Sequence, residues 1–399
     1  MRLVEQEQRK MKILVLGLYY DNNLGDAVIC DCVAARLRIL FTDAHIDIRD
    51  YVNRTAFPVP QESSMQKLHY RRRRMLLRQI ATQYTPWDKQ VVHEEWKLRC
   101  WGDLSYIDAV CQKDYDFVVF GGGQVFMDYL ALFAEAFVQR FAQKGTPMFF
   151  NACGTGPAFS RKIRERLSAA LMDPKVKLVS SRDDVELINR FYMNGEKRAV
   201  PTYDPALWCS EIYGVTKNLD ADTVGLGVMY TNSVSPKAVA RFWVRLIREM
   251  ERRRIPWKIF VNGSGDDVTF ARYVHSLLPE LGCPFEDCFA SVPTRPEELV
   301  KMIARFKSII SFRLHSHIIA ASLDIPSVAM VWDNKLNFFF NKIGHSERCC
   351  TVREHAGTVL AKLTCAEQEG YDRQQLEEQK RYADQLLVQS IYREMKMES

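Results

Sequence analysis

Short apolar runs alternate with helix-like segments along nearly the whole chain, and this alternation limits the possible folds more than any other feature. Residues 12–17 and 117–120 have the pattern of buried strands, and a helix-like stretch at about 25–40 follows the first. A second series starts at residue 223 and continues to a strand at 327–331. Strands that alternate with helices predict parallel, doubly wound sheets. The sequence therefore predicts an α/β fold with two halves that face each other across a cleft.

The predicted domain organisation has three parts. The N-terminal half covers residues 11–210 and includes a basic insertion at about 61–100, whereas the C-terminal half covers residues 222–365. We place the boundary where residues 211–222 have a turn-like polar composition. A long polar helix is expected to occupy the terminal segment 366–399.

The composition is that of an ordinary soluble globular protein, with 47% hydrophobic and 26% charged residues. No secretory signal is apparent, and no apolar stretch reaches the roughly 18 residues that a membrane helix needs. These observations predict a cytoplasmic protein. The 11 cysteines are scattered, and neither Cys30 and Cys32 nor the adjacent Cys349 and Cys350 have a usual disulfide or zinc spacing. We therefore expect reduced thiols and no metal site.

The net charge of +6 is concentrated in the basic insertion, where nine Lys and Arg residues stand against four acids. Four consecutive arginines, Arg71 to Arg74, precede Met75, two leucines and Arg78. This segment can face anionic lipid headgroups at the inner face of the membrane, hold a pyrophosphate-bearing acceptor, or form a solvated basic face. A nucleic-acid partner is not expected, because no recognised binding motif accompanies the charge.

The triplet Arg313-Leu314-His315 lies between an apolar run and a helix-like stretch. A helix that follows a strand directly presents unpaired amides and a positive dipole end, which together favour an anion. Arg313 can hold a phosphate or carboxylate through two hydrogen bonds, and His315 can donate a proton near neutral pH. The alternative is a salt bridge and a helix-cap contact with no catalytic role.

The segment from Asp21 to Ala27 follows the first strand. Asn23 and Gly25 suit a tight turn, and Asp26 can either cap the next helix or accept a proton from a sugar hydroxyl. Asp128 is a second candidate base. The segment is not a dinucleotide-binding fingerprint, because the G-x-G-x-x-G pattern is absent.

Glycines and further charged residues follow other strands. Gly121, Gly122 and Gly123 allow either the close approach of a ligand or helix–sheet packing. Arg182 can converge with Arg313 on one anion or pair locally with Asp183. Three more residues have structural or site interpretations: Asp204 is expected in a turn or cap, Lys335 in the cleft or on the surface, and His317 in packing or capping.

Taken in order, these motifs resemble the polysaccharide pyruvyl transferase family over roughly residues 12–345. The matching pieces are Asn23–Asp26, Gly121–Gly123 after Asp116, Gly154–Pro157, Arg182-Asp183, Asp204–Leu207, Arg313–His315, Ile325-Pro326 and Lys335. The resemblance implies a GT-B-like pair of Rossmann-type halves. It also implies transfer of the enolpyruvyl unit of phosphoenolpyruvate onto a sugar hydroxyl pair, which forms a cyclic pyruvate ketal without a cofactor.

By the same resemblance, Arg182 and Arg313 bind the phosphate and carboxylate of phosphoenolpyruvate with the Leu314 amide nearby, and His315 is the general acid. The remaining candidates for substrate binding are Asn23, Gly25, Gly121, Gly122, Gly123 and Lys335, with Asp26 as a second catalytic candidate. One departure concerns a serine that often follows the Arg-Asp pair, since Val185 and Glu186 occupy that region.

The implied acceptor is a saccharide on a nucleotide or lipid-pyrophosphate carrier, used in surface-polysaccharide synthesis. Two other functions stay open. In a GT-B glycosyltransferase, Arg313 and Lys335 would hold the pyrophosphate of a nucleotide sugar and His315 would contact the sugar. The third function is that of a non-catalytic sugar- or nucleotide-binding member of an assembly complex.

Overall fold

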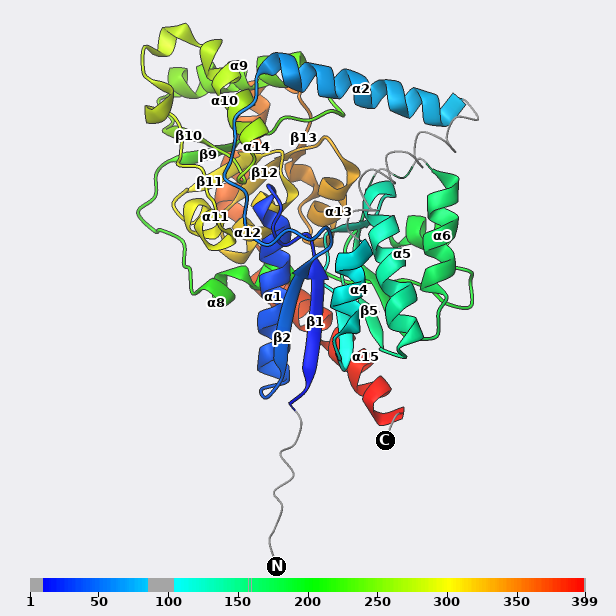
Figure 1. Ribbon diagram of the computed structural model, residues 1–399. Coiled ribbons are helices and arrows are strands. Elements are labelled where there is room, and N and C mark those ends of the chain that lie inside the picture. Colours follow the sequence, from blue (N-terminus) through cyan, green and yellow to red (C-terminus); the bar gives the residue numbers. More distant parts are fainter. Residues whose placement is uncertain (1–9, 85–103, 157, 159, 398–399) are drawn as a thin grey trace, which may run out of the picture.

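The computed structural model describes residues 10–84, 104–156, 158 and 160–397 (Figure 1). Its core consists of two parallel sheets, one in each half of the chain. The first has six strands in the order β2-β1-β3-β5-β7-β8. Their bounds are Lys12–Gly17 (β1), His45–Asp50 (β2), Phe117–Phe120 (β3), Met148–Phe150 (β5), Val176–Ser181 (β7) and Val200–Pro201 (β8). A short parallel pair, Gln124–Phe126 (β4) and Gly154–Thr155 (β6), lies outside this sheet.

The second sheet has five strands in the order β10-β9-β11-β12-β13. Their bounds are Val224–Gly227 (β9), Trp257–Phe260 (β10), Ser308–Ser311 (β11), Ser327–Met330 (β12) and Cys349–Cys350 (β13). All the strand pairs in both sheets are parallel. The predicted pair of doubly wound α/β halves is therefore confirmed.

Helices cover both sheets because the connections between parallel strands must cross a sheet face. In the N-terminal half these are Leu24–Leu40 (α1), Leu104–Gln112 (α4), Asp128–Gln143 (α5), Arg161–Leu171 (α6), Val185–Phe191 (α7) and Cys209–Tyr213 (α8), with a 3₁₀ turn at Pro205–Trp208 (η1). In the C-terminal half they are Pro236–Arg253 (α9), Gly265–Ser276 (α10), Pro296–Ile303 (α11), Leu314–Ser322 (α12), Asn334–Lys342 (α13) and Ala356–Glu369 (α14). Three 3₁₀ turns, Pro279–Leu281 (η2), Phe285–Asp287 (η3) and Ser346–Arg348 (η4), complete this half.

Helix α9 illustrates how the sequence forms these elements. Pro236 occupies its first turn, where a missing amide hydrogen costs no helical bond. Val239, Trp243 and Met250 are buried at helical spacing, and the C-cap residue after the helix is Arg254, whose φ of 56° is left-handed. One face of the helix thus packs on the sheet while the other carries charge.

The order of each sheet reverses at one point, between β1 and β3 in the first and between β9 and β11 in the second. Ligands of open α/β sheets bind at the carboxyl ends of strands next to such a reversal. Asn23 to Asp26 follow β1, Gly121 to Gly123 follow β3, and Arg313 follows β11. The topology therefore places these candidate residues at the two positions where a ligand is expected.

The basic insertion contacts the C-terminal half although it belongs to the N-terminal half in sequence. Helix α2 (Met65–Tyr84) lies beside α10 (Figure 1). Tyr230 donates to the Leu68 carbonyl, and Arg71 forms an ion pair with Asp266 at 2.8 Å. Three basic residues of the predicted insertion (Lys89, Lys97 and Arg99) lie outside the described residues, as does the side chain of Arg78.

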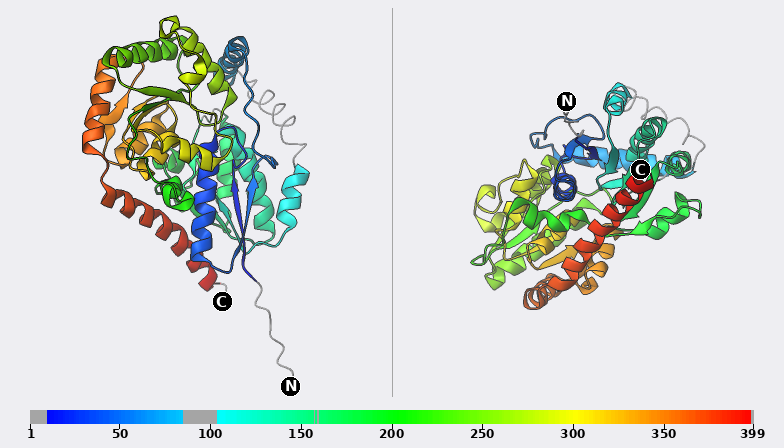
Figure 2. Two further views of the ribbon diagram at one scale, coloured as in Figure 1. Left: turned by 90° about the vertical axis from the view of Figure 1, so that its left-hand side faces the viewer. Right: turned by 90° about the horizontal axis from the view of Figure 1, so that it is seen from below.

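The helix expected over residues 366–399 is present but begins later, at Arg373. Helix α14 ends before Gly370, whose φ of 67° suits glycine, and a separate helix α15 spans Arg373–Met397. Helix α15 runs back along the N-terminal half, where Asp384 pairs with Arg36 at 2.6 Å (Figure 2). None of the described helices combines the length and apolarity that a membrane span requires.

Candidate functional site

Arg313 is the N-cap residue of α12, directly after β11 as the sequence predicts. Its guanidinium holds the Asp267 carboxylate through two hydrogen bonds, of 2.6 Å from Nη2 and 3.1 Å from Nε. Asp267 comes from the first turn of α10, and its side chain is only 1% exposed, whereas that of Arg313 is 21% exposed. Arg313 is therefore oriented by a buried carboxylate and still reaches solvent.

Arg182 follows β7 and is buried, with its side chain 4% exposed. It forms a salt bridge with Asp204, so the local pair with Asp183 considered from the sequence is not the one that forms. Asp183 instead accepts hydrogen bonds from the Thr155 amide and the Ser181 hydroxyl. Arg182 Nε is buried without a hydrogen-bond partner among the described residues, a condition that often marks a ligand site.

The two halves meet at His315, in the first turn of α12. Arg182 Nη1 lies 3.2 Å from His315 Nε2. A guanidinium can only donate, so Nε2 accepts this bond and the imidazole is neutral with its proton on Nδ1. The fold thus brings together the arginine of the N-terminal half and the Arg-Leu-His motif of the C-terminal half.

Burial lowers the pKa of His315 well below its ordinary value, and the positive charges of Arg182, Lys335 and Arg313 lower it further. This differs from the expectation of a histidine that donates a proton near neutral pH without tuning. His315 is therefore a neutral imidazole at neutral pH, with no imidazolium proton to donate. A bound anion would offset the three cations and favour the imidazolium.

Gly25 lets the His315 ring approach helix α1. A Cβ atom at Gly25 would lie 2.3 Å from both Cγ and Nδ1 of that ring, closer than side-chain contacts allow. The sequence suggested a tight turn for this glycine. In the structure it lies in the first turn of α1 and provides the space for the histidine of the other half.

Asp26 does not cap α1, because that helix begins two residues earlier, at Leu24, with Asn23 as the N-cap residue. Instead, Asn23 Nδ2 donates to Asp26 Oδ2 at 2.8 Å. Burial raises the pKa of Asp26 to about 6, and the charge of Arg182 is the largest opposing influence. The Asn23 side-chain oxygen is buried without a partner among the described residues.

The three glycines after β3 have different surroundings. Gly122 and Gly123 have φ values of 90° and 79°, which L side chains rarely adopt. A Cβ at Gly121 would meet Val15 and one at Gly122 would meet Ile29, so both pack against the core. Gly123 alone of the three faces Asp26, with 3.4 Å between a hypothetical Cβ and Oδ1.

Lys335 belongs to the site rather than to the outer surface. Its side chain is 11% exposed and lies 4.6 Å from the centre of the Trp332 ring. Burial lowers its pKa, and it interacts electrostatically with both Arg182 and Asp26. His317, in contrast, contacts the Ser311 carbonyl at 3.0 Å and packs on Phe340, as expected of a packing residue.

The sequence analysis missed two residues that shape the site, Asp267 and Lys342, and the partner of a third. Asp267 carries no signal beyond its position in a first helical turn. Asp204 caps a 3₁₀ turn by accepting from the Ala206 amide, as expected of a turn or cap residue, but its pairing with Arg182 was not foreseen. Lys342 donates to the carbonyls of Arg182 and Thr202, each at 2.7 Å, and so ties α13 to the N-terminal half. Burial lowers the pKa of Lys342 to about 8.

Asp128, the second candidate base, accepts hydrogen bonds from the Ser160 amide at 3.1 and 3.3 Å. Ser160 is the N-cap residue of α6, so Asp128 joins the starts of two neighbouring helices. This arrangement gives Asp128 a structural part in the N-terminal half.

Two Rossmann-like sheets whose carboxyl edges share one group of charged residues define the GT-B-like class. Solved structures support this class. The UDP-GlcNAc 2-epimerase from Methanocaldococcus jannaschii has a TM-score of 0.58 at 11% identity, over 96% of this chain and 99% of that chain. An S. aureus MnaA structure with UDP has a TM-score of 0.55 at 11% identity, over 97% of each chain. At such identity the likeness shows the fold alone.

A family model described as polysaccharide pyruvyl transferase matches residues 23–334. The chain therefore belongs to this family, as the resemblance of its motifs predicted. A search of curated proteins finds no match.

Proposed function

We propose that this protein transfers the enolpyruvyl unit of phosphoenolpyruvate onto two hydroxyls of one sugar, forming a pyruvate ketal during surface-polysaccharide synthesis. One observation carries the proposal beyond the family. Three cations from both halves (Arg182, Arg313 and Lys335) surround a buried histidine at the carboxyl ends of the strands. Such a site suits a small ligand that carries several negative charges and receives a proton during the reaction.

Phosphoenolpyruvate carries a phosphate and a carboxylate, and we assign these groups to the two arginines. Arg313 keeps donors available beyond the two that hold Asp267, and the unpaired amides at the start of α12, including that of Leu314, lie beside it. Arg182 offers its unpartnered Nε. Lys335 adds charge without the geometric demands of a guanidinium.

Binding of this anion would raise the pKa of His315 by offsetting the cations around it. The imidazolium then donates a proton to C3 of the enol, and positive charge develops at C2. A sugar hydroxyl attacks C2, phosphate leaves, and a second hydroxyl of the same sugar closes the ketal. The two sugar hydroxyls each lose a proton. One proton replaces the proton that C3 gained, and the other leaves with the phosphate.

Asp26 is our candidate for the base that accepts the first hydroxyl proton. Its pKa of about 6 leaves it mostly ionised at neutral pH while it remains a stronger base than an ordinary carboxylate. Asp26 directly follows Gly25 in the chain, and the His315 ring packs against Gly25. These steps require anion binding and proton transfer, so the proposed chemistry draws on no cofactor.

For the acceptor we propose a sugar carried on a nucleotide or lipid pyrophosphate, with α2 as the element that approaches a membrane surface. Arg73 and Arg74 are exposed on this helix, and the Leu77 side chain is 59% exposed. Basic and apolar groups on one helix are typical of peripheral contact with anionic lipid. The location consistent with this proposal is the inner face of the cell membrane.

The direct test is phosphate release from phosphoenolpyruvate in the presence of candidate sugar acceptors. We expect the wild type to release phosphate and His315→Gln to be slower by about 10²–10⁴-fold, the usual contribution of a general acid. His317→Gln is the matched control, because it alters a buried histidine of the same helix that faces Ser311 and Phe340 instead.

The alternatives give different results. A glycosyltransferase would bind and turn over nucleotide sugars and ignore phosphoenolpyruvate. A non-catalytic binding protein would bind a ligand with no turnover in the wild type. Full activity in His315→Gln would contradict the assigned acid.

A further inference from the structure

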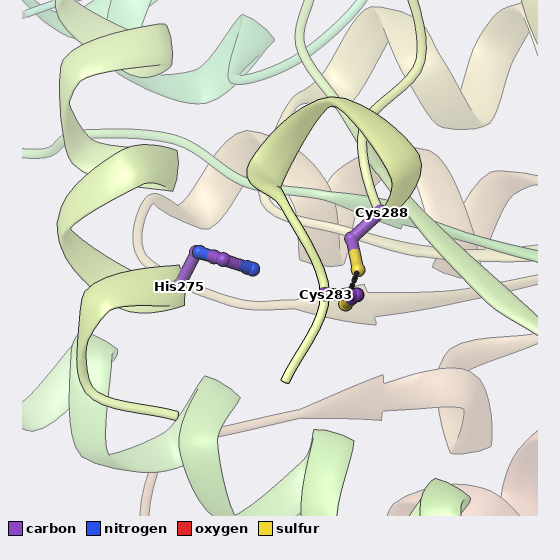
Figure 3. Close-up of side chains that lie close together, drawn as sticks. All are labelled: His275, Cys283 and Cys288. Atoms are coloured by element: carbon purple, nitrogen blue, oxygen red, sulfur yellow. Dashed lines mark hydrogen bonds between the residues drawn. The ribbon is translucent and has the colours of Figure 1, made fainter. Parts of the chain in front are cut away.

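His275, Cys283 and Cys288 form a compact cluster in the C-terminal half (Figure 3). His275 lies in the last turn of α10, Cys283 follows η2, and Cys288 follows η3. Their ligand atoms, one nitrogen and two sulfurs, all lie within 4.8 Å of one another, and the two Sγ atoms are 2.8 Å apart. The spacing along the sequence matches no common zinc motif, so only the fold reveals the group.

The backbone holds the three residues from different sides. Gly282 has a φ of 63° and turns the chain immediately before Cys283. The Cys288 carbonyl accepts a hydrogen bond of 2.8 Å from the Ile259 amide, which ties this residue to β10. Helix α10 fixes His275. Helix α10 therefore presents His275, and the short connection that follows it presents both cysteines.

The imidazole provides the observation that points to a ligand. His275 Nε2 is buried and has no hydrogen-bond partner among the described residues. A buried nitrogen without a partner is costly unless something binds it. A second cluster, His345, Glu347 and Glu369, lacks this feature, because His345 pairs with Glu347 and Glu369 pairs with Arg348.

We propose that His275, Cys283 and Cys288 bind a divalent cation of the zinc class, with the fourth position open to water. Imidazole nitrogen and thiolate sulfur are the ligands that Zn²⁺ prefers. On a tetrahedron with Zn–S bonds of about 2.3 Å the two sulfurs lie about 3.8 Å apart. The sulfurs therefore need to separate by roughly 1 Å, which small rotations about the side-chain bonds provide.

Metal binding must displace protons from both thiols. The cation replaces the two thiol protons, which pass to solvent, and the neutral imidazole binds directly. Affinity should therefore increase with pH.

A disulfide between Cys283 and Cys288 is the competing outcome. It would require an oxidant and would leave His275 Nε2 without a partner, so the structure favours the cation. The cation would clamp the end of α10, whose first turn carries Asp267, the partner of Arg313. The proposal is otherwise independent of the pyruvyl transfer reaction.

The test uses the reduced full-length protein, dialysed against Zn²⁺ and then against metal-free buffer, with zinc per chain measured by mass spectrometry. We expect one equivalent in the wild type. Co²⁺ in its place should give the visible bands of a tetrahedral site with thiolate ligands. Cys283→Ser and His275→Asn should weaken binding by at least the 10–100-fold that loss of an outer-shell partner costs.

Cys349→Ser is the matched control, because Cys349 is also half-buried but lies outside the cluster, and it should retain the metal. The wild-type cobalt spectrum is informative even if a variant fails to fold. The proposal is wrong if the reduced wild type binds no stoichiometric zinc, if Cys283→Ser binds as well as the wild type, or if the two thiols are found as a disulfide under reducing conditions.

Discussion

Arg182 and Arg313 each lie between the end of a strand and the start of a helix, one in each half, yet their surroundings differ. Arg182 is 4% exposed, forms a salt bridge with Asp204 and contacts His315. Arg313 is 21% exposed and is held by two hydrogen bonds to Asp267. The end of a parallel strand thus holds a buried arginine in one half and an accessible arginine in the other.

The difference suggests separate duties. A buried arginine beside a histidine sets the protonation of that histidine and helps to hold the halves together. A half-exposed arginine, already oriented by a carboxylate, can receive a ligand with little loss of side-chain freedom. Loss of Arg182 should therefore mainly affect folding stability and the protonation of His315. Loss of Arg313 should mainly affect ligand binding. Substitutions at each arginine can test this division between a buried and an accessible charge.

Arg182→Met should lower the free energy of unfolding by about 3–5 kcal/mol, because it leaves the Asp204 carboxylate buried without its cation. Arg313→Met should cost less, since water can reach the space beside Asp267. Urea denaturation measures both. The double variant Arg182→Met/Asp204→Asn should recover part of the loss, because asparagine can still accept from the Ala206 amide. Equal losses for the two arginine variants would refute the division.

Arg313→Ala should abolish stabilisation by phosphoenolpyruvate. In the wild type a ligand at 100 times its dissociation constant adds about 2.7 kcal/mol of stability, which thermal unfolding detects as a higher melting temperature. Arg248→Ala is the control, because it removes an arginine that is exposed and paired with Glu280 in the same half. A wild type that responds to nucleotide sugars and not to phosphoenolpyruvate would favour a glycosyltransferase.

Much of the fold could be predicted because buried parallel strands are continuous apolar runs. The predicted strands at 12–17 and 117–120 match β1 and β3 residue for residue. The C-terminal helix was predicted to begin at residue 366 instead of Arg373, although Gly370 is visible in the sequence, because the polar pattern continues across that glycine. A single glycine interrupts a helix only when the chain needs the conformation that it permits.

The charged candidates could be found from the ends of strands, but their partners could not. Asp204 and Asp267 pair with arginines 22 and 46 residues away, so only the folded chain brings them together. The surroundings of His315 could not be predicted for the same reason. Its burial and the three cations around it come from both halves, whereas the sequence shows only its neighbours in the chain.

Helix α2 carries two arginines, Arg73 and Arg74, that are more exposed than Arg182 and Arg313. If the helix contacts anionic lipid, Arg73→Gln/Arg74→Gln should weaken binding to vesicles that contain acidic lipids by about 2 kcal/mol, roughly 30-fold. Sedimentation with vesicles measures this change. The control variant Arg161→Gln/Lys162→Gln removes the same charge from the start of α6 and should bind normally. An equal loss in both variants would indicate attraction through net charge alone.

The smallest expected effect is a change in the titration of His315, followed by NMR. Removing a nearby positive charge favours the imidazolium, so the pKa of His315 should rise in Arg313→Gln and rise further in Arg182→Met/Asp204→Asn, since Arg182 is the strongest of the three cations acting on it. His317 is an internal reference, because burial lowers its pKa to about 4 and no cation contributes. A larger shift in Arg313→Gln than in the Arg182 variant would mean that the accessible arginine, and not the buried one, controls the acid.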